Sequence, residues 1–240
     1  MGYQLAAIGL SPLLIAQALY VKRVTPRLPE PSGERSGITG SGRSLNLLIL
    51  GDSAAAGVGV ATQRQALAGQ LVSKLGAGFQ VSWKLIAQTG HKAKDTLAEL
   101  NKLSPEAFNV VVTSIGVNDV THGTGVGKWI DHQSQIIETL ISRFRLSHII
   151  LSGVPPMHLF PALPQPLRWY FGMRAKEFNV ALKKLAHRYR ECEFVGINFS
   201  PDKTLMADDG FHPGESAYSL WAEYVAAVIQ NRLIVEKFSD

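Results

Sequence analysis

Three short apolar runs constrain the fold of this 240-residue chain more than any other feature. Residues 45–50 read LNLLIL, Val110–Ser114 read VVVTS and His148–Ser152 read HIILS. Runs this short that are apolar at nearly every position are typical of parallel strands with helices packed on both faces. We expect two further strands at residues 79–85 and 193–197. Helical patterns lie between or after these runs, at residues 64–75, 95–103, 128–144, 174–189 and 215–233.

The alternation of strand and helix patterns from about residue 44 onward predicts the fold class. It favours an α/β, three-layer α/β/α sandwich with a mainly parallel five-stranded sheet, in a flavodoxin-like arrangement. A chain of this length supports one core of that size and leaves no room for a second enzyme-sized domain. Ligands of such sheets bind at the carboxyl ends of the strands, so we expect functional residues directly after each strand.

Composition excludes several classes of protein. Apolar residues make up 46% and charged residues 18% of the chain, which argues against disordered and fibrous proteins. The net charge is +5, but the sequence has no zinc-finger spacing and no aromatic RNA-binding consensus, so we expect no nucleic-acid partner. The single cysteine, Cys192, excludes an intramolecular disulfide and a multi-cysteine metal site, and we expect it to pack as a small hydrophobe.

The first 21 residues carry no charged side chain, and Lys22, Arg23 and Arg27 follow them closely. About 20 apolar residues can just span a bilayer, so this segment fits an uncleaved anchor or a membrane-lying helix. A signal peptide cleaved near Ala16-Gln17-Ala18, which would leave a periplasmic or secreted protein, and a docked soluble helix are the alternatives. If the segment spans, its basic flank favours a cytoplasmic domain. We expect association with a membrane, with the side left open.

The chain is therefore expected to have three parts. Residues 1–24 form the hydrophobic helix, and residues 25–43, which hold three prolines and four glycines, form a linker. Residues 44–240 form the α/β domain.

The first candidate for chemistry follows the first expected strand, in Gly51-Asp52-Ser53. A serine in a strand-to-helix turn exposes its hydroxyl, and the following helix directs amides toward developing negative charge. Ala55 replaces the last glycine of a Gly-x-Ser-x-Gly elbow, so this is a different kind of turn. Alone, the motif is more typical of a turn than of an active site.

Three further motifs follow later strands or precede the last helix. They are Gln88-Thr89-Gly90, Gly116-Val117-Asn118-Asp119 and residues 208–213, which read DDGFHP. In this chain order the four motifs resemble those of the SGNH hydrolases, the GDSL family of serine esterases and lipases. The resemblance covers residue 44 to the C-terminus. It implies the SGNH hydrolase fold and ester hydrolysis that needs no cofactor and no metal.

The resemblance also implies a role for each matched residue. Ser53 would be the nucleophile, His212 the general base and Asp209 the acid that orients the imidazole. Asp208 is the rival for that last role, but Asp209 alone fits the spacing Asp-x-x-His. A loop histidine near a helix start is the plainer interpretation of His212.

Acyl transfer also needs donors for the oxyanion, and the resemblance assigns three: the backbone N–H groups of Ser53 and Gly90 and the side-chain amide of Asn118. Glycine leaves room for close approach of the backbone, and asparagine donates without adding charge. Considered separately, Gly90 would be a turn residue and Asn118 a helix cap. Asp52 and Asp119 are expected to tie loop amides together.

Substrate choice is expected to come from the loops. Residues 154–171 hold five prolines and many large apolar groups, which fits a wall of an acyl pocket, a membrane-facing rim or packing over the sheet edge. Residues 168–190 carry seven basic side chains and one acidic one, which fits contact with anionic lipid or a solvated helix face. The candidate pocket residues are Asp52, His91, His122, Val154, Pro155, Phe160 and Phe211.

These features together favour a serine carboxylester hydrolase acting on short-to-medium acyl esters through an acyl-enzyme, with lysophospholipids and thioesters as candidate substrates. A deacetylase of acetylated carbohydrate or cell-wall polymer is the alternative enzyme. An acyltransferase would use the same residues. A non-catalytic binding module on the same fold is the alternative of another class. The sequence predicts no oligomeric state.

Overall fold

The structure of the protein, a computed structural model, describes residues 2–197 and 203–237. Met1 and residues 198–202 and 238–240, which belong to the predicted segments 1–24 and 44–240, lie outside the described residues.

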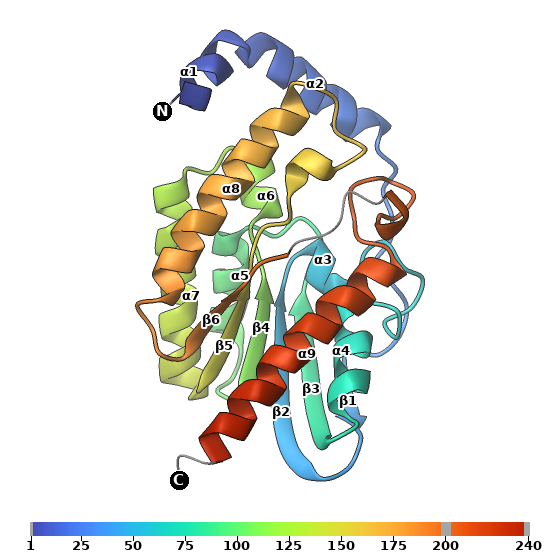
Figure 1. Ribbon diagram of the computed structural model, residues 1–240, viewed down its shortest axis with the longest axis vertical. Helices are drawn as coiled ribbons and strands as arrows, with labels where there is room; N and C mark the ends of the chain where they lie inside the picture. The colour runs from blue at the N-terminus through green and yellow to red at the C-terminus, as the bar shows by residue number, and fades with distance from the viewer. Residues whose placement is uncertain (1, 198–202, 238–240) are drawn as a thin grey trace.

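A six-stranded sheet in the order β1-β3-β2-β4-β5-β6 lies between two helical layers (Figure 1). The predicted α/β/α class is confirmed, with one strand more than expected. The strands are β1 (Ser36–Thr39), β2 (Arg43–Gly51), β3 (Phe79–Ala87), β4 (Val110–Ser114), β5 (His148–Ser152) and β6 (Cys192–Val195).

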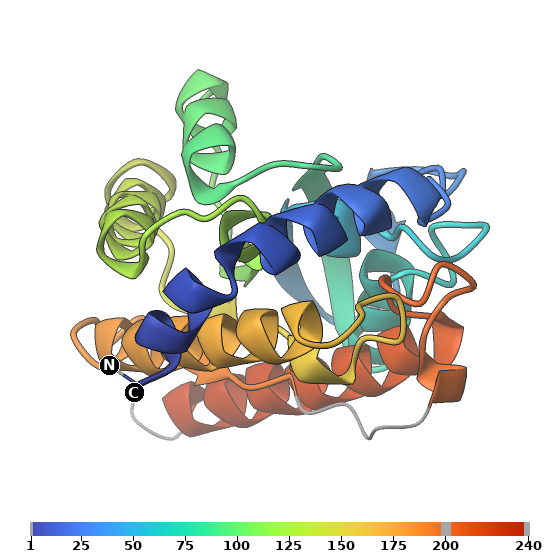
Figure 2. The ribbon, with the colours of Figure 1, turned by 90° about the horizontal axis from the view of Figure 1, so that it is seen from above.

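The helices alternate with the strands along the chain. They are α1 (Gly2–Gly9), α2 (Ser11–Val24), α3 (Ser53–Ala56), α4 (Leu67–Leu75), α5 (Ala93–Lys102), α6 (Val117–Thr121), α7 (Val126–Phe144), α8 (Leu167–Ala186) and α9 (Glu215–Lys237), with short 3-10 helices η1 (Met157–Leu159) and η2 (Lys203–Leu205). Helices α5, α7 and α8 cover one face of the sheet, and α4 and α9 cover the other (Figure 2).

The central strand β2 contributes to both cores. Leu48 and Leu50 pack toward α5 and α7, whereas Leu47 and Ile49 pack toward α4 and α9, and all four are fully buried. Successive side chains of a strand point to opposite faces, so burial on both faces requires apolar residues at every position. This is the physical reason for the continuous apolar runs.

The additional strand, β1, lies within residues 25–43, so the expectation of a plain linker was wrong for this part. Ser36 to Thr39 pair antiparallel with Lys84 to Val81 of β3, at the edge of the sheet. All four residues of β1 are exposed, so it carries no apolar pattern that marks a strand. The strand forms because the backbone groups at the edge of β3 supply its hydrogen bonds.

The register of the parallel strands aligns their carboxyl ends. Gly51 pairs with Ala87 of β3 and with Ser114 of β4, and Ser114 pairs with Ser152 of β5. The segments that follow these four residues therefore begin side by side along one edge of the sheet.

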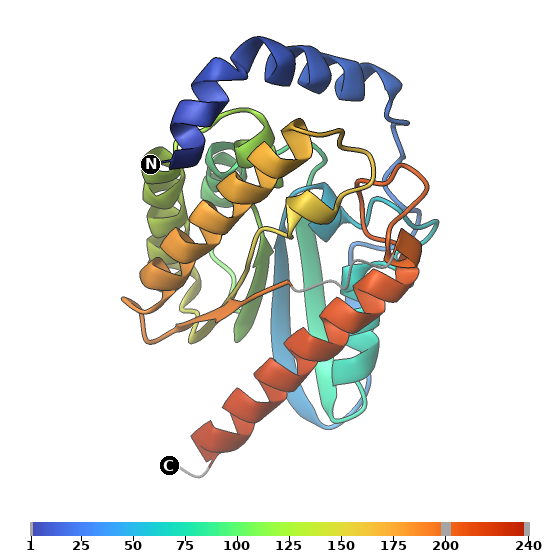
Figure 3. The same cartoon turned by 45° about the horizontal axis from the view of Figure 1, so that its top comes forward.

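The N-terminal helices lie above this edge (Figure 3). Leu14 and Val21 are buried, and the Gln17 side chain accepts from Leu167 N–H and donates to the Gln165 carbonyl at the start of α8. In the described part of the chain no single helix has the length and apolar character of a membrane span. The α1–α2 pair meets that test jointly, with a bend of 80° between its helices.

Candidate active site

Ser53 follows β2 and begins helix α3. The Asp52 carboxylate caps this helix by accepting a hydrogen bond from Ala54 N–H at 3.1 Å. This cap leaves the half-buried Ser53 side chain facing His212, whose Nε2 lies 3.0 Å from Ser53 Oγ. The turn therefore presents a serine hydroxyl to an imidazole from the opposite end of the chain.

His212 is held in turn by Asp209. Its Nδ1 lies 2.6 Å from Asp209 Oδ2, and Asp209 Oδ1 accepts from the N–H groups of Phe211 and His212, each at 2.9 Å. Burial alone would raise the pKa of Asp209, but the hydrogen bonds from His212 and Phe211 lower it below its ordinary value. Asp208 is exposed. Of the two carboxylates considered from the sequence, Asp209 is the one that contacts the imidazole.

Two further carboxylates lie buried beneath these loops and bind backbone amides. Asp119 accepts from Ala93 N–H at 2.9 Å, which connects α6 to the start of α5. Burial raises the pKa of Asp119, and it raises the pKa of Asp52 to about 7. Asp119 thus connects two segments at the carboxyl edge of the sheet, whereas Asp52 caps its own turn.

Residues 88–91 form a tight turn after β3, and Gln88 N–H donates to the Gly51 carbonyl at 3.2 Å. His91 N–H donates to the Gln88 carbonyl at 3.2 Å, and Gly90 has a φ of +88°. A positive φ at the third position is the geometry of a type II turn, which favours glycine there. The Asn118 amide donates to the His91 carbonyl at 3.0 Å, and it carries a second N–H. The turn that carries Gly90 therefore contacts Asn118 at the start of α6.

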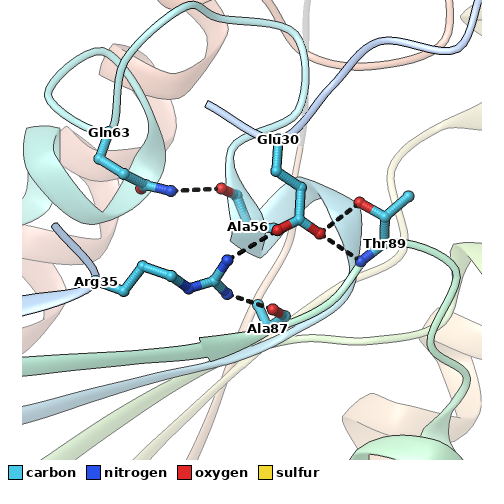
Figure 4. A network of polar contacts seen from close by, with 6 residues as sticks. All are labelled: Glu30, Arg35, Ala56, Gln63, Ala87 and Thr89. Atoms are coloured by element: carbon cyan, nitrogen blue, oxygen red, sulfur yellow. Dashed lines mark hydrogen bonds and ion pairs between the residues drawn. The ribbon is translucent and has the colours of Figure 1, made fainter. Parts of the chain in front are cut away.

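A polar network from the N-terminal segment holds this turn (Figure 4). Glu30 Oε1 accepts from Thr89 N–H at 2.8 Å and from Thr89 Oγ1 at 2.7 Å, while Arg35 Nη1 donates to Glu30 Oε2 at 2.8 Å. Arg35 also donates to the Ala87 carbonyl. Burial opposes ionisation of Glu30, but the hydrogen bonds from Thr89 and Arg35 lower its pKa below the ordinary value. Sequence reasoning missed Glu30 and Arg35 because they lie in the segment taken as a linker.

A small apolar cavity of about 30 Å³ opens beside the Ser53 hydroxyl. Four of the candidate pocket residues line it together with Ser53 and His212, namely Asp52, Pro155, Phe160 and Phe211. The rings of Phe160 and Phe211 meet edge to face, with centroids 5.1 Å apart.

The other three candidate pocket residues lie elsewhere. Val154 is buried beneath Gly116, where an added Cβ would come within 2.6 Å of its side chain. His91 borders a separate hollow next to β3, and His122 is exposed at the end of α6, where its Nδ1 lies 2.8 Å from the Asn118 carbonyl. Proximity in sequence to Gly90 and Asn118 was therefore a poor guide to the cavity wall.

Sequence reasoning also missed several residues that line the cavity. Ser114 ends β4 next to Gly51, and its position at the carboxyl end of an expected strand was a usable signal. Met206 and Trp221 reach the cavity from the region around η2 and from α9. Their placement depends on tertiary packing, and no local pattern marks them.

The apolar segment 154–171 is only partly a loop, because it contains η1 and the first residues of α8. Met157, Phe160 and Leu163 are buried in the core, so the segment packs on the domain and also supplies part of the cavity wall. In the basic segment that follows, Arg174 is buried, donates to the Thr124 carbonyl and lies 5.5 Å from the centre of the Phe178 ring. The Arg174 side chain therefore packs in the interior. Five other basic side chains of residues 168–190 are exposed, namely Lys176, Lys183, Lys184, Arg188 and Arg190.

The arrangement as a whole fits covalent catalysis. A hydroxyl, an imidazole and a carboxylate in hydrogen-bonded sequence allow the imidazole to accept the hydroxyl proton during attack on an electrophile. The Asn118 amide and backbone N–H groups such as those of Ser53 and Gly90 are the kinds of donor that stabilise developing negative charge.

Comparison with known proteins adds two findings. Residues 49–220 match the model of the GDSL-like Lipase/Acylhydrolase family. No curated protein matches the sequence.

Several solved structures share the fold at low sequence identity. The psychrotrophic esterase EstA from Pseudoalteromonas sp. is 19% identical with a TM-score of 0.62, over 78% of this chain and 98% of that one. Est24, a carbohydrate acetylesterase from Sinorhizobium meliloti, is 16% identical with a TM-score of 0.57, over 78% and 99%. The lipase Lip_vut3 from a goat rumen metagenome is 18% identical with a TM-score of 0.62, over 76% and 96%.

Proposed function

Because this chain belongs to the GDSL-like lipase/acylhydrolase family, we propose that it is a serine carboxylester hydrolase acting on short-to-medium acyl esters. The observation that carries the proposal is the hydrogen-bonded sequence of Ser53, His212 and Asp209. Ser53 Oγ lies 3.0 Å from His212 Nε2, and His212 Nδ1 lies 2.6 Å from Asp209 Oδ2.

The reaction proceeds in two halves through an acyl-enzyme. Ser53 Oγ bonds to the ester carbonyl carbon while its proton moves to His212 Nε2. Asp209 stabilises the imidazolium and holds its tautomer. The ester C–O bond then breaks, and the leaving alcohol takes the proton from His212. A water molecule repeats the sequence, which releases the acid and restores the Ser53 hydroxyl.

In this mechanism three donors stabilise the oxyanion. They are the N–H groups of Ser53 and Gly90 and the Asn118 N–H that the His91 carbonyl leaves available. Losing one such donor typically costs ~10²–10³ in rate.

The cavity beside Ser53 supports a short acyl group. Its volume is about 30 Å³, and its walls are mostly apolar, with Phe160 and Phe211 on one side. A small apolar cavity also suits an acetyl group, so a deacetylase of acetylated carbohydrate is the second candidate. Lysophospholipids and thioesters are candidate substrates whose longer acyl chains would need the cavity to open.

We also propose that the N-terminal helices associate with a lipid surface. Apolar side chains on the outward face of α1 and α2 are exposed over 60% or more of their surface, among them Leu5, Ile8, Ile15 and Leu19. Lys22 and Arg23 lie in the last turn of α2. A basic side chain close to an anionic lipid surface contributes about 1 kcal/mol to binding. Sedimentation with phosphatidylcholine vesicles, with and without phosphatidylglycerol, tests this. Binding that is absent from both vesicle types contradicts it.

The function is tested with p-nitrophenyl esters from acetate to palmitate. Wild type should hydrolyse the short members best, and Ser53→Ala should lose ~10⁴–10⁶ in turnover while remaining folded. Hydrolysis of acetylated oligosaccharides measured beside the series separates the esterase from the deacetylase. A wild type inactive on all of them points to a binding module, and a Ser53→Ala variant of near wild-type activity removes Ser53 from the mechanism.

A further inference from the structure

The turn that carries Gly90 is restrained by a segment outside the family match, which begins at residue 49. Within the matched region, Gln88 N–H donates to the Gly51 carbonyl at 3.2 Å and Asn118 binds the His91 carbonyl. These contacts hold the two ends of the turn. The contact from outside comes from Glu30, and it reaches the middle of the turn at Thr89.

The middle of the turn decides where the Gly90 N–H points. That N–H belongs to the peptide unit between Thr89 and Gly90, the central peptide of the turn. Type I and type II turns differ by rotation of this central peptide, and the φ of +88° at Gly90 is that of type II. A rotation of the peptide would turn the N–H away without breaking the bond between His91 and Gln88. The anchors at the two ends therefore do not by themselves fix the direction of this donor.

We propose that Glu30 is a positioning residue for the oxyanion site, because it holds Thr89 by both its N–H and its hydroxyl and so fixes the residue from which the peptide with the Gly90 donor extends. The inference rests on the proposed ester hydrolysis. Two hydrogen bonds that one carboxylate oxygen accepts from the backbone and the side chain of the same residue restrict that residue more than either bond alone.

Arg35 compensates the negative charge of the Glu30 carboxylate. A negative charge close to a developing oxyanion would oppose the reaction, but Arg35 Nη1 lies 2.8 Å from the second oxygen of Glu30. The same guanidinium donates to the Ala87 carbonyl at the end of β3 (Figure 4). The Glu30 carboxylate thus accepts the hydrogen bonds of Thr89 while Arg35 compensates its negative charge.

Substitutions at both ends of the contact test this role. Glu30→Ala and Thr89→Val should lower kcat for p-nitrophenyl acetate by about 10- to 100-fold with KM within about twofold, because small misplacements of a catalytic group cost up to ~10². Thr89→Ser keeps the hydroxyl, and Glu30→Gln keeps the acceptor, so both should retain most of the activity. Glu106→Ala is the matched control, since Glu106 forms an exposed pair with Lys84 at 2.8 Å elsewhere on β3.

A second measurement separates positioning from general stability and from the reaction itself. Amide hydrogen exchange should be slow at Thr89 in wild type and faster there in Glu30→Ala, with the strands of the sheet unchanged. A folded Glu30→Ala with unchanged kcat and unchanged exchange at Thr89 overturns the inference while leaving ester hydrolysis intact. A wild type without esterase activity overturns the proposed function instead, and exchange at Thr89 then decides whether Glu30 holds the turn.

Discussion

The imidazole of His212 depends on one of two adjacent carboxylates. Asp209 contacts His212 Nδ1 at 2.6 Å, whereas Asp208 is exposed. We expect Asp209→Asn to lower kcat by ~10³–10⁴, because an amide cannot hold the imidazole in the required tautomer or stabilise its cation. Steady-state hydrolysis of p-nitrophenyl acetate measures the loss.

Asp208→Asn is the matched control for this substitution, and its kcat should stay within about twofold of wild type. Equal losses in both variants would mean that neither carboxylate acts specifically on the imidazole. A loss in Asp208→Asn alone would reverse the assignment.

The motifs predicted which side chains would meet, and the structure brings Ser53, His212 and Asp209 within hydrogen-bonding distance. Parallel strands align their carboxyl ends, which accounts for the motifs that follow strands, whereas the meeting of His212 and Asp209 with Ser53 was expected from the resemblance to the SGNH hydrolases. Glu30 was not predictable in the same way. It reaches Thr89 across 59 positions of sequence, and a single glutamate between prolines carries no periodicity that indicates a partner.

At the scale of elements, the segment around η1 forms part of the wall of the cavity beside Ser53. Phe160 is 3% exposed and its ring meets that of Phe211 at the cavity. We expect Phe160→Ala to shift the preferred p-nitrophenyl ester toward longer chains by enlarging the cavity. The chain-length profile of kcat/KM measures this shift.

Replacing a buried phenylalanine by alanine typically costs ~3–5 kcal/mol of unfolding free energy, so Phe160→Leu provides a milder second variant. Both variants should shift the profile in the same direction. A profile that keeps its optimum in two folded variants would show that Phe160 does not bound the acyl chain.

The N-terminal helices give a prediction that separates their two contributions. Deleting residues 1–24 removes α1 and α2 but keeps Glu30 and Arg35, so kcat for a soluble ester should stay within about threefold while vesicle binding is lost. Removing the buried Leu14 and Val21 should lower the free energy of unfolding by a few kcal/mol, at ~1.5–3 kcal/mol for each buried apolar side chain.

A deletion of residues 1–30 is compared with the deletion of residues 1–24. It also removes Glu30, so kcat should fall as in Glu30→Ala. Vesicle binding that survives either deletion would place the lipid contact elsewhere, such as on the exposed basic residues of α8.

Element boundaries were predictable where burial dictates the residue pattern. Strands β4 and β5 coincide with the predicted runs because both faces are covered. Helix α8 begins at Leu167 rather than at residue 174, directly after Pro166 at its N-cap position. Strand β1 was missed because its exposed residues follow no apolar pattern.

At the scale of the whole molecule, the buried carboxyl group of Asp52 links the free energy of unfolding to pH. Asp52 is 1% exposed, and burial raises its pKa to about 7, well above the ordinary value of 3.8. Between these two values the folded protein binds a proton that the unfolded chain has released. The free energy of unfolding should therefore decrease as pH rises from about 4 to about 7, and this loss should stop above pH 7.

Glu30 and Asp209 act in the opposite sense and in another range. Their pKa values are lowered in the folded protein, so their contribution to stability is present above the ordinary carboxylate pKa and is lost as pH falls below it. The raised pKa of Asp119 acts in the same direction as that of Asp52, so Asp52 is isolated only by comparing wild type with a variant at that residue.

Asp52→Asn tests the effect on the whole molecule. The asparagine oxygen can still accept from Ala54 N–H, but the side chain has no charge to bury. Urea unfolding at pH 5 and pH 8 should show the variant gaining stability relative to wild type as pH rises, by up to a few kcal/mol at about 1.4 kcal/mol per pKa unit. Groups that titrate in both proteins cancel in the difference between their free energies of unfolding. A difference that is the same at both pH values would mean that Asp52 is already ionised in the folded protein at pH 5, held in that state by Ala54 N–H and His212.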